Sequence, residues 1–564
     1  MNLSPAWKRA AGVSLALVMI PLPLMVMLRV TSYGIGSGVV AALGWGCFAW
    51  LYFWPLAALH LYLKGSRWRR WTIGFLCSVP LFLASLAIVY AAIGSRFGPA
   101  SSASWISYLS NTPTWFLLSV LVTRLMRDPG RLARGFMAVS TGLLVVSVVG
   151  TTVYVSTLDR YRWPATGPTR WRITHVSVID PATGSRADDR DVLIDGDRIE
   201  SVIESVRDSA STPAVDGAGR FLVPGLIDAH LHLGVPVEGG TLKLSPGFFL
   251  ESMLTAFAPH RRALIESGVV AVRDVGGAAE ATARIKTAVA RHDLLGPRMF
   301  TVGRLVTSPD GHPAGTIWTR ELRREGAIEA TDSTMLVNAL ERDRVRFKPD
   351  GVKLIFGTIG RARTRLDPGL LRIGVAWARS HQLWVAVHAE TAEEVGTAAA
   401  AGATTVEHAG SMEEPSDSLI ALIVRQQTWL DPTLGEWCKA MQLAGRSSAF
   451  IAQGLLSRQR SIARLRIAGA RFIVGTDVPL VRYGSGLHDE LDLLRGAGFT
   501  EPDLVRLVTS NNARALGQDS TLGAIARGYR ADFILVSADP LADARVLRAP
   551  KMVVRDGQVV LSRH

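Results

Sequence analysis

The sequence predicts a multidomain protein. N-terminal transmembrane helices precede an α/β (β/α)8 TIM barrel, and a small β-sandwich domain is built from segments that flank the barrel. About the first 160 of the 564 residues consist of long apolar stretches, and the mean hydropathy of +0.23 is high for a purely soluble protein. Beyond them, short β-rich runs alternate with longer helical patterns. Both ends of this second part show the period-two alternation of half-buried strands.

Residues 1–160 are expected to form a membrane region with about five transmembrane helices. Each of five stretches is close to the ~20 apolar residues that a helix needs to cross a bilayer. They cover residues 12–28, 35–59, 72–94, 105–123 and 136–157. The fourth is the weakest, because Asn-Thr-Pro-Thr at 111–114 interrupts it. The first could instead be a signal peptide, but no small-residue cleavage site follows it.

The loops between these stretches predict their orientation, because Lys and Arg are retained on the cytoplasmic side. The second and fourth loops carry Lys64, Arg67, Arg69, Arg70, Arg124, Arg127, Arg131 and Arg134, whereas the others carry only Arg29 and Arg96. This alternation predicts a multi-pass membrane protein with a cytoplasmic N-terminus, helices in contact with membrane lipid, and an extracytoplasmic barrel. If the fourth stretch does not span, the barrel moves to the cytoplasm.

A linker at 161–171, with Trp163 as an interfacial aromatic residue, is expected to lead into a small β domain made of 172–224 and 518–564. The first segment contains WRITHVSVID, DVLIDGDRIESVIE and AVDGAGRFLVPG, and the second contains ADFILVSADP and KMVVRDGQVVLS. Turn residues such as those at 195–196 separate these runs. The shared character of both segments predicts that they pair.

Residues 225–517 are expected to form the barrel. Eight apolar runs alternate with helical patterns: LIDAHLHL, VVAVRDVG, RMFTVGR, VKLIFG, WVAVHAE, TTVEHAG, WLDPTLG and RFIVGTDVP. Eight such units over about 250 residues match a (β/α)8 barrel, whose chemistry takes place at the carboxyl ends of the strands. The stretch from 305 to 350 is longer than an ordinary connection and is expected to carry a loop over the site.

Composition excludes several classes of protein. Three scattered cysteines, Cys47, Cys77 and Cys438, are too few for a disulfide framework or a cysteine-based zinc site. The net charge of +14 is spread over the chain rather than gathered into a basic, aromatic stripe, so no nucleic-acid partner is expected.

Polar residues lie at the predicted carboxyl ends of five strands: His230, His232, Lys353, His388, His408 and Asp477. A single histidine on an apolar strand is usually a satisfied core residue. This many buried polar groups need a metal or tight pairing, because an unpaired buried charge costs several kcal/mol. His230 and His232 share one face of their strand. Imidazole and carboxylate together favour zinc.

Lys353 admits two interpretations. As an ammonium group it would repel a divalent metal. Desolvation and metal charge could favour the neutral amine, which can add carbon dioxide and become an anionic carbamate between two metals. Alternatively, Lys353 pairs with a substrate anion.

From about residue 170 onward, the chain resembles the amidohydrolase superfamily, and the HxH, Lys, His, His, Asp set matches its binuclear type. The segments SGVVAVRDVGG, GPRMFTVGRLVTSPDGH, GVKLIFG, VAVHAE and TTVEHAG resemble the imidazolonepropionase-related and Xaa-Pro dipeptidase-like branch. The resemblance covers about 390 of the 564 residues and does not include the membrane region.

The resemblance implies two divalent metal ions and carbon dioxide bound as a carbamate on Lys353, which bridges the ions. His230 and His232 would bind the more buried ion, and Asp477 would complete its site. The other ion would be held by His388 and His408.

The expected function is hydrolysis of a C–N bond by a metal-activated hydroxide, in a small amide, peptide or lactam substrate. Two metals can lower the pKa of a shared water toward ~7. Asp477 would take the proton of the water and deliver it to the leaving nitrogen. A dipeptidase or carboxypeptidase activity fits this scheme. His312, in SPDGHPAG, is either a catalytic-site histidine that touches substrate or a supporting one.

Two alternative functions remain open. One is a mononuclear deaminase or imidazolone-type ring hydrolase with Glu390 as proton shuttle, although Lys353 argues against it. The other is a non-enzymatic membrane scaffold or sensor with a vestigial barrel, which the complete ligand set argues against.

Nearby polar residues are expected to be structural. Glu407 precedes His408 and should point to the opposite face of the strand. Arg273 and Asp274 are interpreted as a buried pair, and Asp228 as a residue that orients the first strand or caps it. The arginines Arg320, Arg323 and Arg324 either meet a substrate carboxylate or form a solvated helix face.

Overall fold

The computed structural model describes residues 160–164, 167–205, 212–234, 255–316, 318, 320–357, 364–411 and 414–563. The predicted membrane region, residues 1–160, lies outside this part of the chain except for residue 160. All five predicted transmembrane helices are therefore outside the described residues. The chain divides into two compact units, and all described residues except 255 and 256 belong to the unit of 160–243 and 257–564. Within the described residues, no helix is both long and apolar enough to cross a bilayer.

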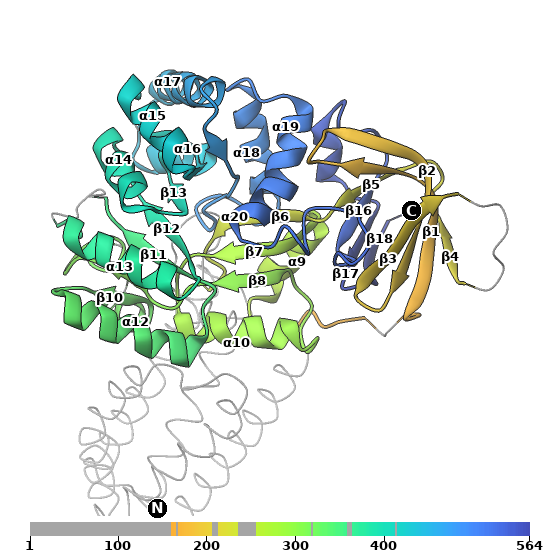
Figure 1. The fold of residues 1–564 in the computed structure, drawn as a ribbon, viewed down its shortest axis with the longest axis horizontal. Coiled ribbons are helices and arrows are strands. Elements are labelled where there is room, and N and C mark those ends of the chain that lie inside the picture. Colours follow the sequence, from red (N-terminus) through yellow and green to blue (C-terminus); the bar gives the residue numbers. More distant parts are fainter. Residues whose placement is uncertain are drawn as a thin grey trace, which may run out of the picture. The chain divides into compact units, whose positions relative to one another are not determined.

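The small β domain is a mixed sheet with the order β18-β17-β16-β5-β1-β2-β3, and β4 pairs with β1 (Figure 1). Its strands are β1 (Arg170–Asp180), β2 (Ser185–Asp195), β3 (Arg198–Glu204), β4 (Ala214–Asp216), β5 (Phe221–Pro224), β16 (Phe533–Val536), β17 (Met552–Arg555) and β18 (Gln558–Ser562). The ladder between β5 and β16 joins the N-terminal and C-terminal segments.

The sequence predicted a sandwich of two sheets in this domain, but one hydrogen-bonded path joins these strands into a single sheet. Register shifts in β1 on both sides of Val176, beside His175 with its positive φ of 54°, allow the sheet to bend. The bent sheet encloses one core, in which Ile173 and Val192 of the N-terminal segment pack with Phe533 of the C-terminal segment.

Among the described residues, eight parallel strands form the barrel, in the order in which the sequence predicts them. They are β6 (Leu226–Leu231), β7 (Val269–Asp274), β8 (Arg298–Thr301), β11 (Gly351–Ile355), β12 (Trp384–His388), β13 (Thr405–Glu407), β14 (Trp429–Asp431) and β15 (Arg471–Phe472). Most of their residues are buried, as expected for parallel strands that are covered on both faces.

Two bridges close the ring of strands. The parallel bridge between Val302 and Gly351 connects β8 to β11, and the bridge between Leu231 and Val478 connects β6 to the segment after β15. At this second seam the carbonyl oxygen of His230 accepts hydrogen bonds from the backbone N–H groups of Thr476 and Asp477 at 3.0 and 2.8 Å. The first and last strands of the barrel therefore meet beside His230.

Helices surround the barrel (Figure 1). They are α9 (Ala258–Glu266), α10 (Ala279–Ala290), α12 (Ser333–Phe347), α13 (Pro368–Ser380), α14 (Ala392–Ala401), α15 (Asp417–Gln426), α16 (Leu434–Leu443), α17 (Ser448–Ile467), α18 (Ser485–Arg495), α19 (Glu501–Arg506) and α20 (Asn512–Ala515). Helix α14 begins at a capping box of Thr391 and Glu394 and ends at Gly402, whose φ of 88° suits glycine.

The long connection from 305 to 350 contains regular structure as well as a loop. It holds β9 (Leu305–Thr307), α11 (Arg320–Gly326), β10 (Ala327–Glu329) and α12. Strand β9 pairs with β11 of the barrel and with β10, which places the intervening loop near the carboxyl end of β11.

Candidate metal centre

Strand β6 and the residue that follows it supply the first two candidate ligands. His230 is fully buried, and its Nε2 has no hydrogen-bond partner in the described part of the chain. The Nδ1 of His232 lies 2.8 Å from the carbonyl oxygen of Gly276. A carbonyl only accepts, so Nδ1 of His232 carries a proton and Nε2 is the ring nitrogen that faces the centre. Although burial opposes the charged form, the hydrogen bond to Asp477 and the charge of Asp477 raise the pKa of His232. Burial, reinforced by the charge of Lys353, lowers the pKa of His230 to about 4, so His230 is neutral at pH 7, as a ligand must be.

Asp477 reaches this centre from the turn after β15. Its Oδ1 lies 3.0 Å from Nε2 of His232 and 3.5 Å from Nε2 of His230. Although burial opposes the charged form, His230 and His232 lower the pKa of Asp477 to about 2. Gly475 makes the turn possible, because a Cβ there would lie 2.2 Å from the Cβ of His230.

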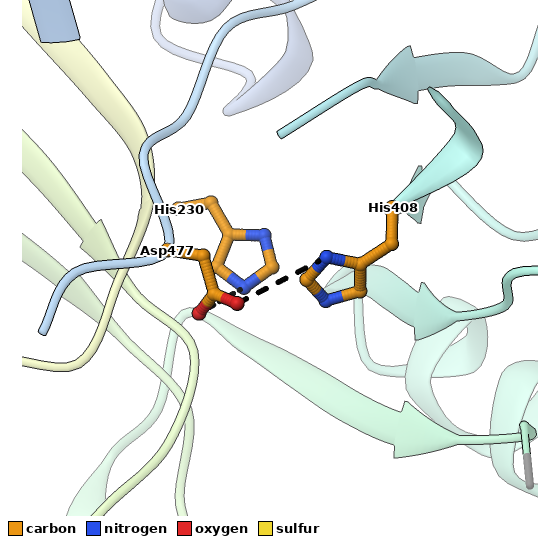
Figure 2. Close-up of side chains that lie close together, drawn as sticks. All are labelled: His230, His408 and Asp477. Carbon is orange, nitrogen blue, oxygen red and sulfur yellow. Dashed lines mark ion pairs between the residues drawn. The ribbon is translucent and has the colours of Figure 1, made fainter. Parts of the chain in front are cut away.

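His388 and His408 approach from the neighbouring strands β12 and β13, with ring centroids 4.3 Å apart. The ring of His408 lies 5.0 Å from that of His230, and its Nδ1 is hydrogen-bonded at 2.8 Å to Oγ1 of Thr433. The ligand atoms of His230, His408 and Asp477 lie within 4.8 Å of one another (Figure 2). Side chains that are distant in the sequence thus converge at one place.

Lys353, on β11, is 1% exposed, and its Nζ has no hydrogen-bond partner in the described region. Burial lowers the pKa of Lys353 to about 8 even though the carboxylates of Glu407 and Asp477 oppose this shift. In the ladder between β11 and β12, Lys353 is paired with Ala386, two residues before His388. Its charge helps to lower the pKa of both His230 and His408.

The donor set fits divalent metal ions. Three of the candidate ligand atoms, Nε2 of His230, Nε2 of His388 and Nζ of Lys353, are buried nitrogen atoms without a hydrogen-bond partner among the described residues. Leaving such atoms unsatisfied costs about 1–3 kcal/mol each. Coordination by neutral imidazole and carboxylate, as zinc prefers, would satisfy the histidines.

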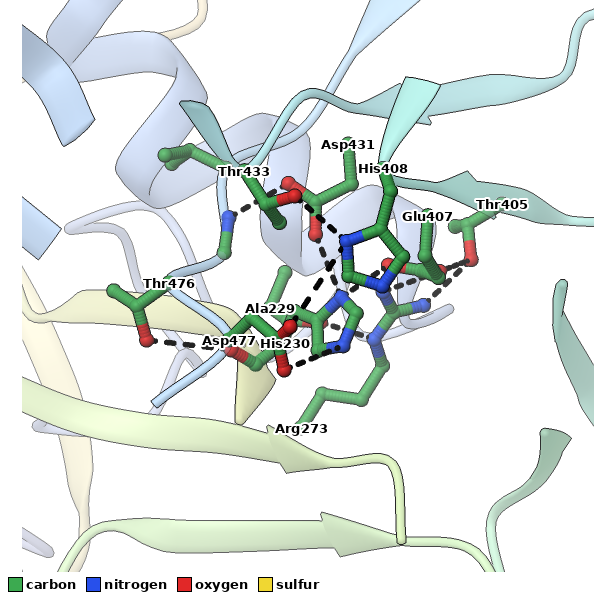
Figure 3. A network of polar contacts seen from close by, with 12 residues as sticks. Ala229, His230, Arg273, Thr405, Glu407, His408, Asp431, Thr433, Thr476 and Asp477 are labelled. Atoms are coloured by element: carbon green, nitrogen blue, oxygen red, sulfur yellow. Dashed lines mark hydrogen bonds and ion pairs between the residues drawn. The ribbon is translucent and has the colours of Figure 1, made fainter. Parts of the chain in front are cut away.

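Glu407 corrects the prediction that it faces away from His408. Its Oε2 lies 2.8 Å from Nδ1 of His230, so its side chain points into the barrel (Figure 3). Strand alternation fails here because His408 follows the end of β13 and has a φ of 63°. Although burial opposes the charge, Arg273 and His230 hold the pKa of Glu407 well below its usual range.

The predicted pair of Arg273 and Asp274 is also wrong. The guanidinium of Arg273 donates to both carboxylate oxygens of Glu407 at 2.8 Å. Asp274 instead accepts from the backbone N–H groups of Leu233 and Gly276 at 3.0 and 3.1 Å. Adjacent residues on a strand point to opposite faces, so these two side chains cannot meet.

Asp228 and Asp431 support the centre from either side of His230. Asp228 accepts from the hydroxyl of Thr476 at 2.7 Å and from the backbone N–H of His230 at 3.2 Å, so it orients both β6 and the turn of Asp477. Asp431 was not singled out in the sequence. Its Oδ2 lies 3.2 Å from Nδ1 of His230. Its position at the end of the seventh barrel strand, in WLDPT, is the feature of the sequence that could have indicated a role at the site.

His312 lies near the cluster. Its ring centroid is 5.7 Å from that of His388, and its Nδ1 is hydrogen-bonded to the hydroxyl of Thr316 at 2.9 Å. Burial, and then the charge of His388, lower the pKa of His312 to about 3. Glu390 is also close, with Oε1 3.6 Å from Nε2 of His388.

The loop arginines divide into separate roles. Arg323 donates to Oε2 of Glu329 at 2.6 Å and to Oδ1 of Asp310 at 2.7 Å, and these bonds tie the loop that carries His312 to β10. Arg324 is exposed, as a solvated helix face predicts. The position of the Arg320 side chain lies outside the described atoms.

A closed α/β barrel with histidines, a lysine and an aspartate at its strand ends defines a class of metal-dependent hydrolases. Within this class the chain belongs to the amidohydrolase family, whose sequence profile matches residues 221–560.

Comparison with individual proteins agrees with this assignment. An uncharacterized protein of Mycobacterium tuberculosis (strain H37Rv) is 25% identical over 363 residues, which cover 62% of this chain and 89% of the relative. The 5'-deoxyadenosine deaminase of Methanothermobacter thermautotrophicus is 24% identical over 61% of this chain and 80% of its own. The crystal structure of a Xaa-Pro dipeptidase with bound methionine superposes with a TM-score of 0.60 at 21% identity, covering 69% of this chain and 99% of the dipeptidase.

Proposed function

We propose that this amidohydrolase is a binuclear metal enzyme that hydrolyses the C–N bond of a small amide, peptide or lactam, with dipeptides as the first substrates to test. The observation that carries the proposal is the cluster of buried nitrogen atoms of His230, Lys353 and His388 that have no hydrogen-bond partner among the described residues, beside His408 and Asp477. Family membership and the structural likeness to a Xaa-Pro dipeptidase support it.

The chain would hold two divalent ions, preferably zinc. His230, His232 and Asp477 would bind one ion, and His388 and His408 the other. When bound, such a pair activates a water molecule and polarises the scissile carbonyl group. The neutral amine of Lys353 would form an N–C bond to carbon dioxide and release one proton to solvent, which leaves an anionic carbamate between the two sites.

Asp477 would handle the proton of the reaction. With its low pKa it is an ionised carboxylate at neutral pH, so it can accept the proton of the attacking water and pass it to the leaving nitrogen. His312 would contact the substrate from the loop after β9, where burial keeps its ring neutral.

Metal content tests this proposal. Elemental analysis of the purified wild type should give about two divalent ions per chain, and Lys353→Ala should lose metal. A screen of dipeptides and N-acyl amino acids then identifies the substrate. One ion per chain in both proteins would contradict the bridging role of Lys353.

A mononuclear deaminase or ring hydrolase is the second candidate. The position of Glu390, 3.6 Å from His388, and the similarity to a 5'-deoxyadenosine deaminase favour it. One ion per chain, together with ammonia release from adenosine-type substrates, would select this function over peptide hydrolysis.

We also propose that the enzyme is a multi-pass membrane protein with a cytoplasmic N-terminus and an extracytoplasmic barrel. The apolar stretches and the loop charges of residues 1–160 support this proposal. Single cysteines introduced at exposed barrel positions, in a chain without its three native cysteines, should react with an impermeant maleimide in intact cells. Labelling only after lysis would place the barrel in the cytoplasm.

A further inference from the structure

A continuous chain of buried polar contacts runs from Arg273 to His230 (Figure 3). Arg273, on β7, is 1% exposed. Its Nη1 donates to the hydroxyl of Thr405 at 2.8 Å, its Nη2 donates to both oxygens of Glu407 at 2.8 Å, and its Nε donates to the carbonyl oxygen of Ala229. One guanidinium therefore connects β6, β7 and β13 inside the barrel.

Glu407 extends this chain to the candidate ligand. Its Oε2 lies 2.8 Å from Nδ1 of His230, and both residues are fully buried. A carboxylate that receives two bonds from an arginine acts only as an acceptor. The proton of His230 is therefore held at Nδ1, and the lone pair is left at Nε2, which has no hydrogen-bond partner among the described residues and lies 3.5 Å from Oδ1 of Asp477.

The surroundings of His230 differ from those of two other candidate ligands. The Nδ1 of His232 meets a backbone carbonyl, and that of His408 meets the hydroxyl of Thr433. Of these three histidines, only His230 has carboxyl oxygens at hydrogen-bond distance from Nδ1, those of Glu407 at 2.8 Å and Asp431 at 3.2 Å. The contact of Nδ1 of His408 with Oδ2 of Asp477 is longer, at 3.9 Å. A carboxylate behind a metal-binding histidine raises the basicity of the ligand and fixes the orientation of its ring.

We propose that Glu407, anchored by Arg273, is a positioning residue that presents Nε2 of His230 to a divalent cation and thereby makes the site of His230 bind more tightly than the site of His408. The inference rests on the proposed function only in requiring a divalent ion at His230. It does not depend on which C–N bond is cleaved or on the carbamate of Lys353.

Metal affinity of the full chain tests this proposal. Zn²⁺ dissociation constants are measured by competition with a chromophoric chelator, and unfolding temperatures are measured on the metal-free proteins. Glu407→Gln keeps the side-chain shape but removes the charge, and Arg273→Met/Glu407→Gln removes both charges so that neither is left unpaired. Both should weaken the tighter Zn²⁺ site by about 10- to 100-fold.

A matched control separates this effect from the loss of a buried ion pair. Arg555 and Asp532 in the β domain are equally buried, with side chains 1% exposed and Nη1 3.2 Å from Oδ1. Arg555→Met/Asp532→Asn should lower the unfolding temperature as well, but should leave Zn²⁺ affinity unchanged. If Glu407 had only a structural role, both double variants would have a lower unfolding temperature and the Zn²⁺ affinity of the wild type.

A milder variant protects the test against misfolding. Thr405→Val preserves shape and charge but removes the hydroxyl that contacts both Arg273 and Glu407. It should weaken the same site by a smaller factor and change the visible spectrum of the Co²⁺-substituted protein. If the Glu407 variants fold and their Zn²⁺ affinity is unchanged, the inference is overturned. If they do not fold, unchanged Zn²⁺ affinity in Thr405→Val overturns it. A wild type that binds no divalent ion overturns both the inference and the proposed function.

Discussion

Two of the candidate ligands are held in a backbone conformation that most side chains avoid. His408 has a φ of 63° and Asp477 a φ of 55°. Left-handed non-glycine residues cost of the order of 1–3 kcal/mol and persist where the surroundings over-determine them, often at active sites. For Asp477 the hydrogen bonds of Thr476 to Asp228 supply this constraint.

Replacing the carboxylate of Asp477 should abolish proton transfer while the fold is retained. We expect Asp477→Asn to lower kcat by about 10²- to 10⁴-fold, because an amide cannot accept the proton of the attacking water. Steady-state kinetics on the substrate found in the screen and thermal unfolding of the same preparation check this. A variant with wild-type kcat would exclude Asp477 as the base.

His260 gives a prediction about pH. Its ring stacks on that of Tyr483 with the ring centroids 3.9 Å apart, and burial lowers the pKa of His260 to about 4. Between pH 6.5 and 4 the unfolded chain binds a proton that the folded chain does not, so stability falls as the pH decreases through this range, by about 3 kcal/mol in total.

Replacing His260 with phenylalanine tests this pH dependence. His260→Phe keeps the stacked ring but removes the titrating group, so denaturant unfolding should show a shallower loss of stability from pH 6.5 to 4 than in the wild type. Identical slopes for both proteins would contradict the assignment.

At the scale of elements, the turn after β15 positions Asp477 in the candidate metal centre. Asp431 accepts the backbone N–H of Gly475 at 3.0 Å, and Asp228 accepts that of Thr476 at 3.2 Å. These bonds hold the turn against β14 and β6, and Gly475 has no room for a side chain beside His230. Gly475, between β15 and Asp477, is therefore required by the close approach of the turn to His230.

Gly475→Ala should separate the turn from β6. Its Cβ would lie 2.6 Å from the backbone nitrogen of His230, which cannot move without displacing the strand. We expect the metal content to fall below half of the wild-type value, together with a loss of about 1–3 kcal/mol of stability. In the control Gly396→Ala, on α14, the new methyl meets only a flexible methyl of Leu419 at 3.2 Å, and metal content should not change.

At the scale of the whole molecule, an ion network joins the barrel to the β domain. Arg298 of β8 donates to Asp532 at 3.1 Å and to Asp556, while Arg555 pairs with both carboxylates. Breaking a buried pair leaves one charge uncompensated, which costs about 3–5 kcal/mol. The two parts of this unit are therefore expected to unfold together.

Asp532→Ala should lower the free energy of unfolding by about 3–5 kcal/mol. The matched change Asp519→Ala breaks a contact to Arg514 in which both side chains are about half exposed, and should cost less than about 1 kcal/mol. Equal losses in the two variants would show that the network does not stabilise the fold.

Local patterns predicted the barrel strands and the convergence of their polar ends, because apolar runs and strand-end side chains are visible in short windows of sequence. They could not predict that Arg273 pairs with Glu407, 134 residues away, since this contact exists only once the ring closes. The role of Asp431 and the single sheet of the β domain were missed for the same reason. Strands β9 and β10 are three residues each, too short for a periodic signal.

The seam between β6 and the turn of Asp477 also has a consequence for synthesis. Thr476 follows His230 by 246 residues, and a ribosome adds about 5–20 residues per second. His230 and His232 are therefore made roughly 12 to 50 seconds before their aspartate partner is made. A nascent chain stalled before residue 470 would carry five of the six candidate ligands but no closed ring, and we expect it to retain no metal.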